Sequence, residues 1–202
     1  MKQISLIEAG KRFNKDWVFQ SLNIDFEKGH HYAIIGNNGS GKSTLLQVIA
    51  GFTTLSIGTI EWYGADSQSI FDQISIAAPY LELVEELTTI EHFEFHSKFK
   101  SLNDSISINK MIQMIGLENA TNKQIRYFSS GMKQRLKLAL AIFSNTPILL
   151  LDEPCSNLDK EGYALYKELI QQYAMQKIII VGSNDPEEYA FCTQQINLMD
   201  YK

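Results

Sequence analysis

A short glycine-rich segment constrains the fold and the function of this chain more than any other feature of its sequence. Residues 36–43 read Gly-Asn-Asn-Gly-Ser-Gly-Lys-Ser, which fits the phosphate-loop pattern G-x-x-x-x-G-K-[ST]. The apolar run 31–35 before the segment predicts a strand, and residues 43–50 after it predict a helix that ends at Gly51. Because the pattern requires this strand and this helix, we expect a phosphate site here and not an ordinary glycine turn.

The residue types in this loop suit the binding of a nucleoside triphosphate. Glycines let successive backbone N–H groups point at the phosphates, and the following helix contributes a favourable dipole at its N-terminus. The Lys42 ammonium would reach the terminal phosphates, and the Ser43 hydroxyl would bind Mg²⁺. The residues expected to contact ATP are Gly36, Asn37, Asn38, Gly39, Ser40, Gly41, Lys42, Ser43 and Thr44.

Two carboxylates after an apolar run predict the second half of the site. Residues 148–151 read Ile-Leu-Leu-Leu, which is typical of a strand buried in a parallel sheet, and Asp152 and Glu153 follow at once. Ligands of α/β sheets bind at the carboxyl ends of the strands. We expect Asp152 to hold Mg²⁺ and Glu153 to accept a proton from a water that attacks the γ-phosphate. A helix cap is the alternative for Asp152, and Pro154 disfavours it.

The composition and the charge exclude several other classes of protein. The chain has 202 residues, 45% of them hydrophobic, which suits one compact domain. Its net charge of −5 excludes nucleic acid as an expected partner, because nucleic-acid surfaces concentrate lysine and arginine. No apolar stretch reaches the roughly 20 residues of a membrane span, and the start lacks the apolar core of a secretory signal. We therefore expect a cytosolic protein whose Cys155 and Cys192 are reduced packing residues.

Hydrophobic patterning predicts strands at both ends of the chain and helices in the middle. The runs that predict strands are 4–8, 18–26, 58–64, 74–77, 148–151 and 178–181. Thr88 with Glu91 forms a capping box, Ser107 precedes a second helical pattern, and another helix follows Ser129. This order predicts a helical part inserted into an α/β core.

These motifs, in this order, resemble the ATP-binding domain of ABC transporters over nearly all of the chain. The family's signature loop corresponds to residues 129–132, where Ser130 and Met132 stand in place of the usual glycine and glutamine. The resemblance implies that a helix N-terminus there faces the γ-phosphate bound by the other subunit of a dimer. The residues assigned to this role are Ser129, Ser130, Gly131 and Met132. From the residues alone, an ordinary serine-capped helix is the alternative.

The resemblance also implies the fold class and its divisions. The fold is α/β, a P-loop NTPase core with a mostly parallel sheet, an N-terminal antiparallel β part and an inserted helical subdomain. We expect one ABC-type ATP-binding domain over residues 1–202. Its α/β core covers about 1–78 and 145–202, and its helical subdomain covers about 79–144.

Two further segments carry the resemblance. Ser-Asn-Leu-Asp at residues 156–159 corresponds to the D-loop, whose Asp159 would contact the partner subunit, although an Asx-capped helix start would read the same. Phe13 stands where the family usually stacks an aromatic ring on adenine. Trp17 is the alternative for that role, and either ring could belong to the core.

Two positions depart from the family's pattern. After the 178–181 strand the family normally has a histidine, and this chain has Asn184. At a second position the family normally has a glutamine that contacts Mg²⁺, and this chain has Pro79. Asparagine can hydrogen-bond a phosphate or a water but carries no positive charge. We therefore place Asn184 with Glu153 among the catalytic residues and expect slow hydrolysis.

His92 and His96 form a smaller feature of the middle region. They lie four residues apart on a predicted helix, which is a spacing that can bind a metal. No third ligand is placed beside them, so we expect a solvated helix face.

The function expected from these residues is an ATP-binding and ATP-hydrolysing subunit that energises a membrane transporter through ATP-driven dimerisation. Its cofactor is Mg²⁺ with ATP, and its partners are a separate transmembrane permease and a second ATP-binding subunit in a homodimer or heterodimer. We expect it on the cytoplasmic face of a membrane, held there by the permease. One alternative is a nucleotide-binding regulatory subunit with little or no hydrolysis. Another is a small P-loop kinase, which would not account for residues 129–132 and 156–159.

Overall fold

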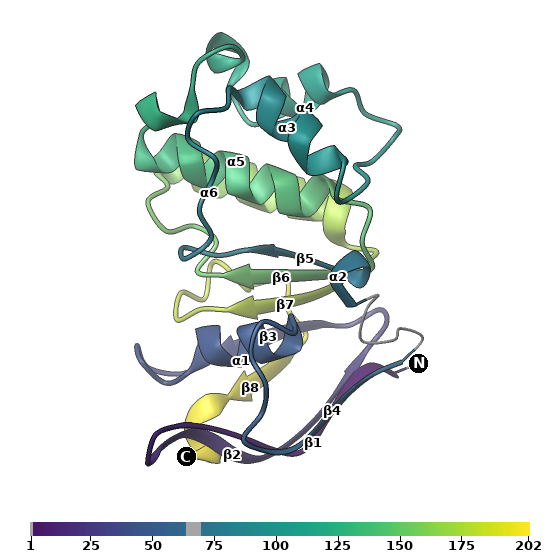
Figure 1. The fold of residues 1–202 in the computed structure, drawn as a ribbon, viewed down its shortest axis with the longest axis vertical. Helices are drawn as coiled ribbons and strands as arrows, with labels where there is room; N and C mark the ends of the chain where they lie inside the picture. The colour runs from purple at the N-terminus through teal and green to yellow at the C-terminus, as the bar shows by residue number, and fades with distance from the viewer. Residues whose placement is uncertain (1, 64–69) are drawn as a thin grey trace.

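The computed structural model describes residues 2–63 and 70–202, which form two sheets and a group of helices (Figure 1). The larger sheet is wholly parallel, with strand order β5-β6-β7-β3-β8. Its strands are β3 (His31–Ile35), β5 (Ile74–Ala77), β6 (Ile148–Asp152), β7 (Ile178–Gly182) and β8 (Gln194–Asn197). Every residue of β6 and β7 is buried, as expected for apolar strands covered on both faces.

The parallel register brings the predicted motifs together. Asp152 at the end of β6 pairs with Gly182 at the end of β7, and Ile34 near the end of β3 pairs with Gly182 from the other side. The segments that follow these three strands therefore leave the sheet at one edge. They are the phosphate loop, the carboxylate pair and the segment that contains Asn184.

The smaller sheet is antiparallel and consists of β1 (Lys2–Phe13), β2 (Asp16–Glu27) and β4 (Ile57–Trp62), in the order β2-β1-β4. Strand β1 extends well beyond the predicted run 4–8, whereas β2 begins two residues before and ends one residue after the predicted run 18–26. Register shifts along β1 interrupt the alternation of apolar and polar residues, so the pattern shows only part of this strand. Gly64, the predicted end of the third strand, lies outside the described residues.

Most of the helices begin where the sequence predicts. They are α1 (Lys42–Ile49), α2 (Ile70–Gln73), α3 (Thr89–Ser97), α4 (Ile108–Met114), α5 (Ser130–Phe143) and α6 (Lys160–Leu169). The capping box of Thr88 with Glu91 is present, and the Ser107 side chain accepts the Lys110 N–H, so both predicted starts are confirmed. The sequence did not predict α2, with four residues, or β8, whose residues are mostly exposed.

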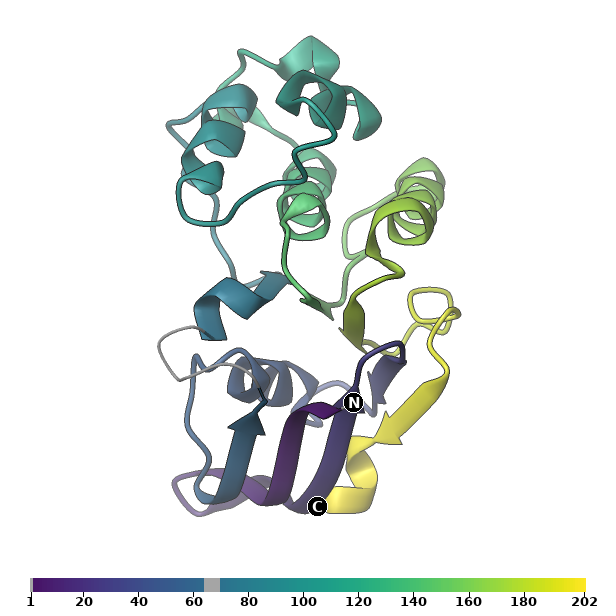
Figure 2. The ribbon, with the colours of Figure 1, turned by 90° about the vertical axis from the view of Figure 1, so that its right-hand side faces the viewer.

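Two apolar cores lie on the two sides of the parallel sheet (Figure 2). One packs β5, β6 and β7 against the helices α3 to α6, and it includes Cys155 and, at its margin, Cys192, which agrees with their expected packing role. The other packs the opposite face of the sheet against α1 and the antiparallel sheet. Helix α1 is therefore held between two sheets, which fixes the loop that precedes it. Within the described residues no helix is both long enough and apolar enough to cross a membrane.

Candidate active site

The loop between β3 and α1 is held close to the antiparallel sheet. Gly41 has φ 104°, and a Cβ added there would lie 2.2 Å from a methyl carbon of Val18 on β2. Only glycine fits both the left-handed backbone and this close approach. The Ser40 N–H donates to the Asn37 carbonyl at 2.9 Å, which closes the turn. The predicted phosphate loop is thus a compact turn that leads directly into a helix.

The N-terminus of α1 has no side chain that satisfies its backbone donors. Among the residues that the structure describes, no side chain caps this helix, and no acidic residue lies in its first turn. The helices α3, α4, α5 and α6 are capped by the side chains of Thr88, Ser107, Ser129 and Asp159 respectively. Because the first N–H groups of a helix have no partner within it, an anion is the group that best satisfies them. The loop and α1 therefore have the structure of an anion site.

Lys42 lies at the centre of this site. Its side chain is buried, and Nζ donates to the Gly36 carbonyl at 2.9 Å, to the Asn37 carbonyl at 3.3 Å and to Asn184 Oδ1 at 3.0 Å. Burial lowers the pKa of Lys42, while the carboxylates of Glu153 and Asp152 raise it. The ammonium is thus held over the loop by neutral oxygens, in a position to meet a phosphate.

Asp152 is a buried carboxylate at the end of β6. Its exposed fraction is 1%, and neither of its oxygens has a hydrogen-bond partner among the described residues. Burial raises its pKa to about 6, with Glu153 adding to the shift and Ser43 and Lys42 opposing it. Buried carboxylates are normally paired or bound to a cation. These orphaned oxygens beside the Ser43 hydroxyl fit Mg²⁺, which takes oxygen ligands.

The unpaired carboxylate predicts a stability change when Asp152 is replaced by asparagine. The pKa of Asp152 is about 6 in the folded chain, against an ordinary 3.8. The folded state therefore favours the protonated carboxyl, and this contribution to the free energy of unfolding is lost as the pH rises through 6. At pH 8, without metal or nucleotide, Asp152→Asn should therefore raise the melting temperature by about 5 °C, and the gain should shrink towards pH 4. Thermal melting in EDTA measures this. Exposed Asp104→Asn is the control, and a lower melting temperature for Asp152→Asn would contradict the unpaired charge.

Glu153 has a strained backbone next to Asp152. Its φ is 44°, in the left-handed region that disfavours residues with a side chain. Its N–H donates to the Gly182 carbonyl at the end of β7, at 2.9 Å. The side chain is exposed, so it can reach a water on the open side of the site.

Asn184 contacts two parts of the phosphate loop. Its Oδ1 accepts from Lys42, and its Nδ2 donates to Asn38 Oδ1 at 2.6 Å. The fold thus brings Asn184 to Lys42 although the two lie 142 positions apart in the sequence. These contacts bring Asn184 to the predicted phosphate loop.

The residues of the signature and D-loop segments act as helix caps within this chain. Ser129 Oγ accepts the Met132 N–H at 3.2 Å, and Asp159 Oδ1 accepts the Gly162 N–H at 2.8 Å. A Cβ added at Gly131 would lie 3.1 Å from the Asn157 carbonyl, so the two segments touch. Ser130 is exposed and Met132 packs at the margin of the helical core. Both capping alternatives from the sequence are therefore present in the fold.

The two candidate aromatic rings differ in their surroundings. Phe13 is 52% exposed at the end of β1, with Lys11 Nζ 5.0 Å from its ring centre. Trp17 is half-buried, with the Arg12 guanidinium 5.4 Å from its ring centre. A Cβ added at Gly10 would lie only 3.0 Å from a carbon of the Trp17 ring, so this ring packs against the strand. Phe13 is thus the more exposed of the two rings.

Tyr80 is a neighbour of the site that the motifs did not indicate. Burial and the nearby Asp152 carboxylate raise its pKa to about 12, and Gln47 of α1 opposes the shift. Pro79, beside it, is exposed, and its carbonyl accepts from Lys137 Nζ at 3.1 Å. The Tyr80 hydroxyl is therefore near enough to the Asp152 carboxylate for its charge to act on the phenol. The parallel pairing of Ala77 with Leu151 is the feature that brings the two segments together.

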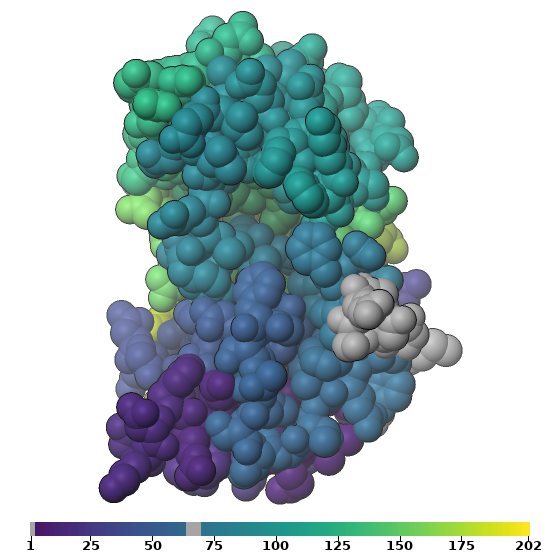
Figure 3. Space-filling model, viewed as in Figure 1, coloured from purple at the N-terminus to yellow at the C-terminus, as the bar shows by residue number. Residues whose placement is uncertain are grey.

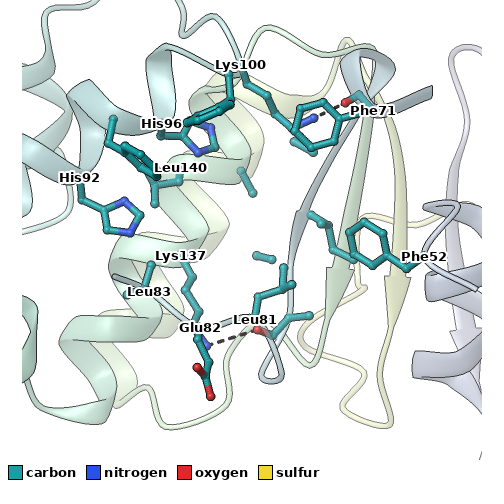
Figure 4. Close-up of a pocket in the computed structure, with 17 residues that line it drawn as sticks. Phe52, Phe71, Leu81, Glu82, Leu83, His92, His96, Lys100, Lys137 and Leu140 are labelled. Carbon is teal, nitrogen blue, oxygen red and sulfur yellow. Dashed lines mark hydrogen bonds between the residues drawn. The ribbon is translucent and has the colours of Figure 1, made fainter. Parts of the chain in front are cut away.

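The prediction of a solvated face for His92 and His96 is wrong. His92 is buried and His96 is half-buried, and both line an apolar cavity of about 310 Å³ between the helices and β5 (Figure 4). On the face in Figure 3 the surface is hollowed at this place. Phe52 and Phe71 face the histidines from the side of the core. Histidine is a polar residue type, so the sequence did not indicate that the face of α3 with His92 and His96 packs inward.

The fold and the site define a P-loop nucleotide-binding domain. The sequence model of the family described as "ABC transporter" matches residues 19–156. The chain is 32% identical to an uncharacterized ABC transporter ATP-binding protein, YybJ of Bacillus subtilis, over 92% of this chain and 87% of that protein. It is 28% identical to the lantibiotic transport ATP-binding protein SrtF of Streptococcus pyogenes, over 86% of this chain and 76% of that protein. The chain therefore belongs to the ABC transporter ATP-binding family, whose members bind and hydrolyse ATP.

Solved structures agree with this fold. The ATP-binding cassette MJ0796, in a dimeric post-hydrolysis state with ADP and phosphate, has a TM-score of 0.81 and 22% identity, over 96% of this chain and 93% of that one. At this identity the likeness concerns the fold alone. It bears out the P-loop NTPase core with its mostly parallel sheet and antiparallel β part.

Proposed function

We propose that this subunit binds Mg²⁺-ATP at the phosphate loop, hydrolyses it slowly, and energises a separate membrane permease through ATP-driven dimerisation. The observation that carries the proposal is the arrangement around Lys42. A buried ammonium, an uncapped helix N-terminus and a buried carboxylate with unpaired oxygens converge at one edge of the sheet. A structural role alone would not require any of the three.

In the proposed mechanism the chain binds ATP and positions one water. Lys42 and the backbone N–H groups of the loop bind the phosphates, while Ser43 and Asp152 hold Mg²⁺. The metal supplies charge neutralisation at the phosphate oxygens. Glu153 accepts a proton from the attacking water, and Asn184 hydrogen-bonds the γ-phosphate once it releases Lys42. Phe13 stacks on the adenine ring, supported by its exposure.

The dimer is the second part of the proposal. Ser129, Ser130, Gly131 and Met132 of one subunit would face the γ-phosphate of the other, and Asp159 would lie against the partner. The dimeric state named for the similar MJ0796 structure supports this arrangement. Because Gly131 already lies close to the Asn157 carbonyl, a larger residue there would push the two segments apart. A homodimer and a heterodimer would use the same surfaces.

The apolar cavity is the proposed docking site of the permease. Phe52, Phe71, Phe95 and Phe99 all line it, and each is at least 43% exposed. Exposed apolar clusters of this kind mark interaction surfaces. Docking there would hold the subunit on the cytoplasmic face of the membrane, as a peripheral protein. In this scheme residues 79–144 form the helical subdomain, and the cavity lies between it and the core.

His92 limits what can occupy this cavity. Its Nε2 accepts the Val84 N–H at 3.3 Å, so the neutral ring carries its hydrogen on Nδ1. That Nδ1 is buried and has no hydrogen-bond partner among the described residues. Burial lowers the pKa of His92 and keeps the ring neutral at pH 7. The docked segment of the permease should therefore present an apolar face to this neutral ring.

Purification from membranes tests the docking. A tagged chain should co-purify with one polytopic membrane protein, and the pair Phe95→Glu and Phe99→Glu should abolish the association, because charges would be buried in an apolar contact. The matched control is Tyr63→Glu, an exposed aromatic outside the cavity. Mass spectrometry identifies the partner, and ATP binding to the variants shows that they fold. Retention of the permease by the double variant would rule out this surface.

The slow rate of hydrolysis in this proposal follows from Asn184. Asn184→His should raise turnover by about 10-fold to 100-fold, since it restores a donor that can carry positive charge at the γ-phosphate. Phosphate release under saturating Mg²⁺-ATP measures it, with ATP affinity as the control. An unchanged rate would mean that another group already supplies this contact. A regulatory subunit without hydrolysis remains the second candidate, favoured by the same two departures, Asn184 and Pro79.

A further inference from the structure

Glu188 is a buried carboxyl group that none of the proposed roles uses. Its exposed fraction is 3%, and it lies four residues after Asn184 in the segment between β7 and β8. Oε1 accepts the backbone N–H of Cys155 at 2.8 Å, and Oε2 is buried without a hydrogen-bond partner among the described residues. The backbone carbonyl of Glu188 accepts from the Tyr166 hydroxyl of α6 at 2.7 Å. The side chain thus reaches the segment after β6, while its backbone is fixed by a helix.

The segment that Glu188 contacts is the one that carries Glu153. Cys155 lies two residues beyond Glu153, and the Ser156 N–H donates to the Glu153 carbonyl at 3.1 Å, so residues 153–156 form a turn. One side of this turn is fixed where the Glu153 N–H donates to Gly182. The other side is fixed where the Cys155 N–H donates to Glu188. Between these two bonds Glu153 has its left-handed φ of 44°.

A left-handed conformation at a residue with a side chain persists only where the surroundings impose it. The two hydrogen bonds on either side of the turn are such surroundings. Without Glu188, the buried Cys155 N–H would lose its acceptor and the turn would lose one of its two anchors. Glu153 would then be free to return to an ordinary φ, which would swing its carboxylate away from its present direction.

Packing alone does not account for a carboxyl group at this position. Burial raises the pKa of Glu188, and the carboxylates of Asp185 and Glu153 raise it further, against the Ser183 hydroxyl and the Cys155 N–H. A methionine or leucine of similar size would avoid the unfavourable burial of a polar group. What the carboxyl group supplies here, and an apolar side chain would not, is an acceptor for the Cys155 N–H.

We infer that Glu188 is a positioning residue, which holds the Glu153 turn in its left-handed form through the backbone N–H of Cys155. This rests on the proposed role of Glu153 as the base that receives the water's proton. The positioning itself concerns the geometry of the turn and is present without ATP. It can therefore be tested apart from catalysis.

Amide hydrogen exchange tests the geometry directly. In Glu188→Ala the Cys155 amide should exchange at least about tenfold faster, while amides of β3 keep their rates and report an intact core. Glu188→Gln retains an acceptor oxygen and should restore protection to within about threefold. Unchanged exchange at Cys155 in Glu188→Ala would overturn the inference, whether or not the chain hydrolyses ATP. Equal acceleration in β3 would also overturn it, because it would show a purely structural role.

Kinetics then tests the link to Glu153. Glu188→Ala should lower kcat by about tenfold and leave KM for ATP within about twofold, and Glu188→Gln should recover most of the loss. In a Glu153→Gln background, Glu188→Ala should change the residual rate by less than about twofold, because the group that it positions is already gone. An equal loss in both backgrounds would overturn the positioning of Glu153 by Glu188. Loss of exchange protection with unchanged kcat would instead contradict the role of Glu153 as the base.

Discussion

Lys42→Ala should lower the affinity of the chain for Mg²⁺-ATP by at least about 100-fold, or about 3 kcal/mol. The ammonium is the point charge at the phosphates, and the uncharged backbone donors of the loop cannot replace it. Its removal also leaves the carbonyls of Gly36 and Asn37 without their buried donor. Isothermal calorimetry with each purified variant measures the change.

The matched control is Lys177→Ala. Lys177 is a half-buried lysine that, like Lys42, donates to backbone carbonyls, here those of Ile142 and Ser144. It precedes β7 and so lies at the opposite end of the sheet. ATP affinity should be unchanged in this variant. If Lys42→Ala bound ATP as tightly as the parent chain, the loop would not be a phosphate site.

Glu153→Gln should lower turnover by at least about 100-fold while ATP affinity stays within about twofold of the parent. Glutamine has the shape of glutamate but cannot accept the proton of the attacking water. The side chain is exposed, so its replacement should leave the bound nucleotide in place. Phosphate release measures turnover. Exposed Glu161→Gln on α6 is the control, and equal rates for the two variants would exclude Glu153 as the base.

The parts of the fold that the sequence predicts are those that depend on neighbouring residues. The strand, loop and helix around Lys42 are confirmed because the glycines, the apolar run and the helix pattern are contiguous. The capping box at Thr88 and the apolar strands β6 and β7 are predictable for the same reason. Strand β8 is mostly exposed and polar, so it forms only because the edge of β3 is available for pairing.

The parts of the site that the sequence does not predict depend on contacts between distant segments. The Asp152 charge acts on Tyr80 only because β5 pairs with β6. Glu188 reaches Cys155 only because the segment after β7 folds back on that after β6. The inward packing of His92 likewise depends on the placement of α3 against the core. No pattern within these segments indicates such neighbours. The sequence motifs therefore indicate the groups proposed to bind ATP and do not indicate the groups that hold them in place.

The ATP-driven dimer is the central claim, and sedimentation velocity of Glu153→Gln tests it most directly. With the γ-phosphate uncleaved, ATP would contact Lys42 of one subunit and Ser129 and Gly131 of the other, so mass action favours the dimer. We predict that Glu153→Gln sediments as a dimer with Mg²⁺-ATP and as a monomer with Mg²⁺-ADP. Adding Gly131→Asp to Glu153→Gln, which puts a Cβ and a negative charge beside the phosphate, should leave a monomer that still binds ATP. A Glu153→Gln chain that remains monomeric with Mg²⁺-ATP would contradict a homodimeric ATP sandwich.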